Sequence, residues 1–96
     1  MELLTEVKRG EEASRIIDNP LFIEAKDKVR SGILKAMGES PMGDEKTHNR
    51  LVIALQLLDQ IEKNLNNVMQ TGKLAAIQMR EKESISEKVR KSFRPR

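Results

Sequence analysis

The chain has 96 residues, a net charge of +3, no Cys, Trp or Tyr, and two aromatic residues, Phe22 and Phe93. A chain of this length forms one domain at most, and without Cys it has neither a disulfide scaffold nor a thiolate zinc site. The longest apolar run is far shorter than the ~20 residues that a membrane span needs, and the N-terminus lacks the pattern of a signal peptide. We therefore expect a soluble protein that stays inside the cell or is assembled into a particle inside the cell.

Helix signals dominate the sequence, and we predict an all-α fold. In the N-terminal segment, residues 1–19, the stretch Glu11 to Ile17 predicts a short helix. Asn19-Pro20 is a start signal for the next helix, because Asn caps free backbone amides and Pro suits the first helical position. Three-and-four spacing predicts one apolar stripe on that helix, which runs to about Met37 with Gly38 as its C-cap. The stripe is Phe22, Ala25, Val29, Ile33 and Ala36.

A second long helix is predicted from Asp44, its N-cap, to Gln70. The polar loop before it has about six residues, a length that makes the two helices antiparallel neighbours. Residues 20–70 therefore predict a helix-loop-helix hairpin. Apolar residues recur with heptad spacing along the second helix. Because a small chain without an aromatic core buries little apolar surface by itself, we expect other chains to cover these residues. The predicted oligomerisation residues, here called the heptad seam, are Leu51, Ala54, Leu55, Leu58, Ile61, Leu65 and Val68.

Residues 71–96 predict a charged, basic C-terminal extension that is helical or frayed. Gly72 is either a hinge or a weak point within a continuous helix, because Gly costs about 1 kcal/mol in a helix interior. From Arg80 to Arg96 there are seven basic and three acidic residues. A basic end of this kind binds nucleic acid without sequence preference, docks onto a protein, or has no specific role. The candidate contacts are Lys88, Arg90, Lys91, Phe93, Arg94 and Arg96.

No residue pattern predicts catalysis, a metal site or a cofactor. His48, the only histidine, pairs at helical spacing with Asp44 alone, which is too few ligands for zinc. The acidic pairs and the serines lie in charge-mixed segments without partners for acid–base or nucleophilic chemistry. Three Asn residues flank Leu65 and are expected on the exposed side of the helix. We therefore expect a protein that is not an enzyme and takes no small-molecule substrate.

Two segments carry a resemblance to known proteins. They are Asn19-Pro20-Leu21-Phe22-Ile23-Glu24-Ala25 and the ending Val68-Met69-Gln70-Thr71-Gly72-Lys73-Leu74-Ala75. With the stretch Leu51–Leu58 between them, they resemble short uncharacterised proteins of tailed phages and prophages. The predicted architecture is also similar to phage small terminase subunits, which implies antiparallel helices that assemble into rings. About 19 residues before the hairpin are too few for the helix-turn-helix domain of that family. In shape alone, the hairpin resembles the dimeric plasmid-copy regulator Rop.

These observations predict a phage or prophage protein of the host cytoplasm or the virion that forms a homo-oligomer. The leading hypothesis is a small terminase-like DNA-packaging component that contacts double-stranded DNA or a phage motor protein through its C-terminus. The alternatives are a virion assembly protein, such as a head-completion or scaffold-like element that docks onto capsid protein, and a Rop-like regulator that binds nucleic acid.

Overall fold

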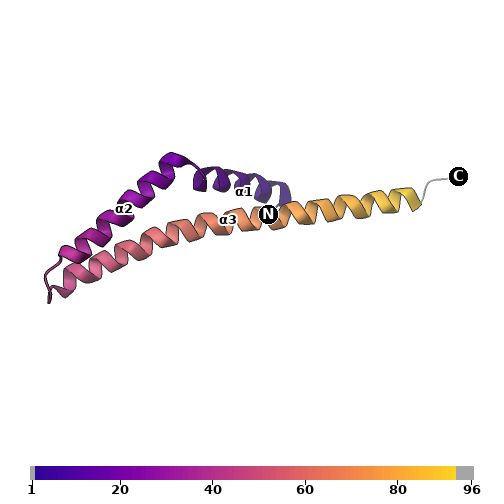
Figure 1. The fold of residues 1–96 in the computed structure, drawn as a ribbon. Helices are drawn as coiled ribbons and strands as arrows, with labels where there is room; N and C mark the ends of the chain where they lie inside the picture. The colour runs from indigo at the N-terminus through magenta and orange to yellow at the C-terminus, as the bar shows by residue number, and fades with distance from the viewer. Residues whose placement is uncertain (1, 93–96) are drawn as a thin grey trace.

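The computed structural model of the chain describes residues 2–92, and three helices account for nearly all of that range (Figure 1). They are α1 (Leu3–Ile17), α2 (Pro20–Glu39) and α3 (Glu45–Ser92). The prediction of an all-α fold is confirmed. Within residues 2–92, none of the helices combines the length and the apolar character needed to cross a membrane.

The corner between α1 and α2 is made by local capping chemistry. The Asn19 side-chain oxygen accepts hydrogen bonds from the backbone N–H of Leu21 at 2.8 Å and of Phe22 at 3.1 Å. Pro20 stands at the first helical position, where its missing N–H costs nothing. The predicted start of α2 is therefore confirmed, but α1 begins at Leu3 rather than at Glu11. The longer α1 reaches α3, and packing against a neighbour is what stabilises most short helices.

The end of α2 differs from the prediction. Gly38 lies inside the helix, which ends at Glu39, and Ser40 takes an extended conformation with φ −66° and ψ 131°. Pro41 follows Ser40, and a residue before Pro is disfavoured in the helical region. The left-handed conformation expected of Gly38 belongs to Gly43, with φ 97°.

The loop then leads into α3. The Asp44 side chain accepts a hydrogen bond from the Thr47 backbone N–H at 3.2 Å, which confirms Asp44 as the cap of this helix. From there α3 continues for 48 residues and passes through Gly72 without a break. The alternative of a hinge at Gly72 is thereby excluded.

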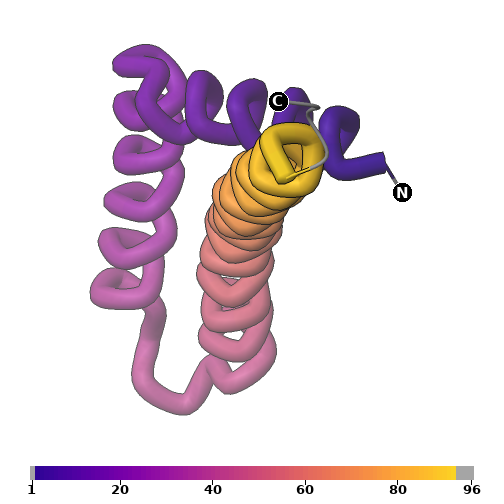
Figure 2. The backbone as a smooth tube through the Cα atoms, turned by 90° about the vertical axis from the view of Figure 1, so that its right-hand side faces the viewer, coloured from indigo at the N-terminus to yellow at the C-terminus, as the bar shows by residue number. Residues whose placement is uncertain are grey.

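The helices are arranged around α3, which runs the length of the molecule. In Figures 1 and 2, α2 runs back along the first part of α3, and α1 then crosses the middle of α3. The last part of α3 extends beyond both, and the molecule measures 82 × 25 × 16 Å. Contacts between α1 and α3 are more extensive than those between α2 and α3. Both ends of α3 are therefore held less tightly than its middle.

The side of α2 that faces α3 coincides with the predicted apolar stripe only in part. Ala25 and Val29 are exposed, whereas two cationic residues, Lys26 and Arg30, are half-buried. The half-buried side of α2 is formed by Phe22, Lys26, Arg30, Ile33, Ala36 and Met37. Spacing alone could not distinguish the two sides, because Lys and Arg also cover apolar surface with their methylene stems. Phe22, Ile33 and Ala36 of the predicted stripe lie on this half-buried side, and Ala25 and Val29 do not.

Very little apolar surface is fully covered. Among the described residues, the buried hydrophobic side chains are those of Ala13 and Ala75. The radius of gyration is 22.3 Å, against about 12.5 Å for a compact chain of this length. The accessible surface is 8034 Å², against about 5,600 Å² for a compact monomer of this mass. A single copy thus leaves far more surface in contact with water than a compact domain does.

Candidate interaction surfaces

The closest packing in the molecule occurs where α1 crosses α3. Gly10 and Gly72 are buried at the crossing, with Ala13 and Ala75 one turn along each helix. A Cβ added to Gly72 would lie 2.7 Å from the Gly10 Cα and 2.9 Å from the Glu6 carbonyl oxygen. Contacts this short leave no room for a side chain on either glycine. The crossing therefore depends on small residues at these positions, as in other close helix pairs.

Charged side chains connect α2 to α3. The Arg30 guanidinium donates to the Asp59 carboxylate at 2.8 Å and to the Glu62 carboxylate at 2.7 Å. The Lys26 ammonium lies 3.7 Å from the Glu62 carboxylate. Hydrogen bonds from Arg30 to Asp59 and Glu62 raise the pKa of the guanidinium above its usual value. Arg30 stays charged until pH rises through that raised pKa, so these pairs act over the whole physiological range.

The predicted oligomerisation residues divide between two environments. Six of the seven, all except Ile61, are half-buried on the sides of α3 that carry α1 and α2. Ile61 is exposed. Part of the heptad seam is thus already covered within the chain, and its role in meeting other chains stays a prediction.

Several apolar residues of α2 and α3 are exposed, among them Val29, which was predicted to share a stripe with Phe22 and Ile33. Leu21 and Val29 of α2, and Ile53 and Leu57 of α3, have large apolar side chains in contact with water. A signal for the α2 residues was present in the sequence. Lys26 and Arg30 share one side of α2, and the acidic residues Asp59 and Glu62 stand on α3 at positions that an antiparallel neighbour can reach. A prediction that paired Lys26 and Arg30 with these acidic residues would have placed Val29 on the side of α2 that faces away from α3.

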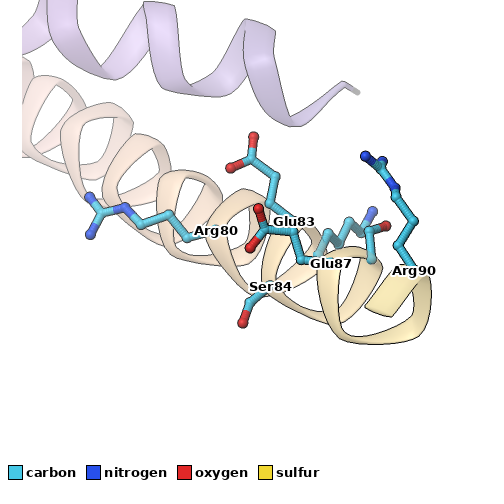
Figure 3. A pocket seen from close by; sticks show the side chains of 7 residues that line it. Arg80, Glu83, Ser84, Glu87 and Arg90 are labelled. Carbon is cyan, nitrogen blue, oxygen red and sulfur yellow. The ribbon is translucent and has the colours of Figure 1, made fainter. Parts of the chain in front are cut away.

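The C-terminal part of α3 projects into solvent. All residues from Arg80 to Ser92 are exposed, including Lys88, Arg90 and Lys91. A shallow open groove runs along this part, and Figure 3 shows both basic and acidic side chains around it. It is lined by Arg80, Lys82, Glu83, Ser84, Ser86, Glu87 and Arg90. All of them belong to one helix, which cannot enclose a ligand. The other predicted contacts, Phe93, Arg94 and Arg96, lie outside the described residues.

The described residues do not form a cluster suited to a metal ion. Nowhere between residues 2 and 92 do three or more His, Cys, Asp or Glu side chains gather in a way that could hold one. His48 is exposed in the first turns of α3, and the Asp44 carboxylate is engaged as the helix cap. Of the three Asn residues beside Leu65, all exposed, Asn64 accepts a hydrogen bond from the Gln60 side chain at 3.1 Å. These residues therefore have structural or solvent-facing positions.

The described residues carry two prominent kinds of surface: the uncovered apolar sides of α2 and α3 and the charged end of α3. Comparison with known proteins adds no assignment to them, since no protein-family model matches the sequence and neither curated proteins nor solved structures give a significant match.

Proposed function

We propose that this chain is a non-enzymatic helical protein that works as a homo-oligomer, with the helices of residues 20–70 as its association unit. The observation that carries the proposal is the small amount of apolar surface that one copy covers. Burial of apolar surface is the main favourable term in folding, at roughly 25 cal/mol per Å². A chain whose buried hydrophobic residues in the described range are two alanines gains little of that term alone. Association with further copies would supply it.

The specific version that we propose is a small terminase-like DNA-packaging component of a phage or prophage, present in the infected host cytoplasm or in the virion. The phage assignment rests on the sequence resemblance. The projecting C-terminal part of α3 supports a contact role for that end, because its basic residues are exposed and distant from the helix crossing. Lys88, Arg90 and Lys91, followed by Arg94 and Arg96, would neutralise phosphates of double-stranded DNA independently of its sequence.

A second candidate is a virion assembly protein in which the same end docks onto a phage motor or capsid protein. Ile85 and Val89 lie one turn apart on the projecting part of α3, and both are exposed. Acidic residues stand among the basic ones there, which weakens attraction to DNA and suits a partner of mixed charge. An exposed apolar pair flanked by charges is a usual composition for a helix-docking surface.

The experiment that tests the proposal is light scattering on the purified chain, at low and at high salt. We expect a mass that is a multiple of 11.0 kDa and persists at high salt, because apolar contacts are not screened. A closed assembly of many copies favours packaging, and a compact dimer favours a Rop-like regulator. A monomer at all concentrations would contradict the proposal.

DNA binding is then measured by fluorescence anisotropy as a function of salt. A contact made through phosphates weakens steeply as salt increases, with a slope close to the number of phosphates neutralised. The full chain and a chain ending at Met79 are compared, and we expect the shortened chain to lose binding. Salt-insensitive binding to a capsid or motor protein, with none to DNA, would favour the assembly function.

A further inference from the structure

The pair Arg30–Glu62 defines how α2 and α3 face one another. Their side chains meet at 2.7 Å, and each is preceded by an apolar residue, Val29 on α2 and Ile61 on α3. Successive helical residues point about 100° apart. Because the helices run antiparallel, one step back on each leads to the same side of the contact. Val29 and Ile61 therefore lie on one side of the α2–α3 pair, with exposed fractions of 52% and 54%.

Both residues belong to rows of uncharged residues, and the row on α3 ends at Ala54 because the next position at this spacing is the exposed Arg50. On α2 the row recurs at intervals of four, four, three and four residues, and on α3 at three and four, so each row keeps to one side of its helix. We call the two rows together the hairpin face: Leu21, Ala25, Val29, Gly32, Ala36, Ala54, Leu57 and Ile61. Six of these eight residues are exposed, and Ala36 and Ala54 are half-buried. In a chain with 34% charged residues, an uncharged surface spanning two helices indicates a contact that excludes water.

We propose that a second copy of this chain packs on the hairpin face, so that two α2–α3 pairs form a four-helix arrangement. The inference rests on the proposed self-association and specifies where it occurs. The same surface would be used by both copies, as two-fold symmetric dimers require. Gly32 and the three alanines permit close approach of helix backbones, while Leu21, Val29, Leu57 and Ile61 supply the large apolar side chains.

The surface area that one copy leaves exposed is large enough for a second copy to bind. One copy exposes 8034 Å², which exceeds the surface of a compact monomer of its mass by about 2,400 Å². A standard protein interface covers about 800 Å² on each partner. The excess, which also includes the projecting end of α3, is about three times that area. The absence of Lys and Arg from the face disfavours nucleic acid as its occupant, because phosphate binding depends on cationic side chains.

The test uses charged substitutions with matched controls on the same helices. Val29→Glu and Ile61→Glu place a carboxylate on the hairpin face. Leu34→Glu and Ile77→Glu place one elsewhere, at residues with exposed fractions of 51% and 49%. We expect sedimentation equilibrium to give at least about tenfold weaker association for the first pair and less than about twofold for the controls. Circular dichroism checks that all four variants keep the helical content of the full chain.

A second readout does not depend on weakening the assembly. The chain contains no Cys, so Ile61→Cys and Ile77→Cys each carry a spin label at a single place. We expect the label at position 61 to lose mobility as protein concentration rises, and the label at position 77 to be unaffected.

The outcomes separate this inference from the proposed function. If the unsubstituted chain associates and all four Glu variants associate equally well, the hairpin face is not the interface, but self-association stands. Equal weakening by Leu34→Glu and Val29→Glu would also overturn the assignment of the face. If the unsubstituted chain is monomeric at every concentration, the proposed self-association fails and the dimer fails with it.

Discussion

Gly10 of α1 and Gly72 of α3 bring two helix backbones into direct contact. A Cβ added to Gly10 would lie 2.8 Å from the Gly72 Cα and 3.3 Å from the Val68 carbonyl oxygen. These neighbours are backbone atoms of a helix and cannot rotate away as a side chain can. The crossing holds the middle of the molecule together, and it gives each glycine a structural reason to stand inside a helix that it would otherwise weaken.

Replacing Gly10 or Gly72 with Ala is expected to destabilise the protein. Ala is the better helix former by about 1 kcal/mol, but the added Cβ forces the helices apart, and such overpacking costs about 1–3 kcal/mol. We expect a net loss in the free energy of unfolding, measured by urea denaturation. Gly38→Ala is the control, because Gly38 lies inside α2 and nothing lies within 4 Å of its added Cβ, and we expect it to stabilise the chain. Equal stabilisation at all three positions would contradict the described crossing.

The ion cluster between α2 and α3 predicts a salt-dependent contribution to stability. Arg30→Gln removes the donor that both Asp59 and Glu62 share, and we expect a lower thermal midpoint in dilute buffer. The difference from the original chain should shrink in about 1 M salt, where charges are screened beyond about 3 Å. Lys28→Gln is the matched control, since Lys28 pairs with Glu24 within α2 at 3.1 Å in a highly exposed position. A loss of stability that is independent of salt would show that packing of the Arg30 stem matters more than its charge.

The cap at Asn19 predicts a local loss of helix stability. Asn19→Ala removes both hydrogen bonds to the first turn of α2, and loss of such a cap costs about 1 kcal/mol. Chemical denaturation monitored by circular dichroism measures the effect. Asn66→Ala is the control, at an exposed position within α3, where Ala favours the helix by a few tenths of a kcal/mol. Unchanged stability of Asn19→Ala would mean that the α1–α2 corner is held by packing alone.

Removal of the C-terminal part of α3 should leave the folded body intact. Every described residue beyond Met79 is exposed, and the helix crossing is complete before it. We expect a chain ending at Met79 to change the free energy of unfolding by less than about 0.5 kcal/mol, as substitutions on open surface do. The mean residue helicity is measured alongside. A large loss of stability would show that this segment packs on the body or on another copy.

The helical class and the places where α2 and α3 begin follow from the sequence alone. Asn19-Pro20 and Asp44 act through hydrogen bonds and dihedral limits within a few residues, so local chemistry suffices to predict them. The three-and-four spacing of apolar residues likewise predicted the apolar character of α3. The spacing did not decide whether Gly72 is a hinge or part of a continuous helix, because glycine is compatible with both.

The outcome of these local signals depends on how the helices pack against one another. Gly72 stays helical because α1 crosses directly over it, and α1 extends back to Leu3 because that crossing stabilises it. The sides of α2 were decided by Asp59 and Glu62, acidic residues some thirty positions away, which draw Arg30 inward and turn Val29 outward. Contacts between residues so distant along the chain depend on how the helices are placed, and helical periodicity carries no information about that placement.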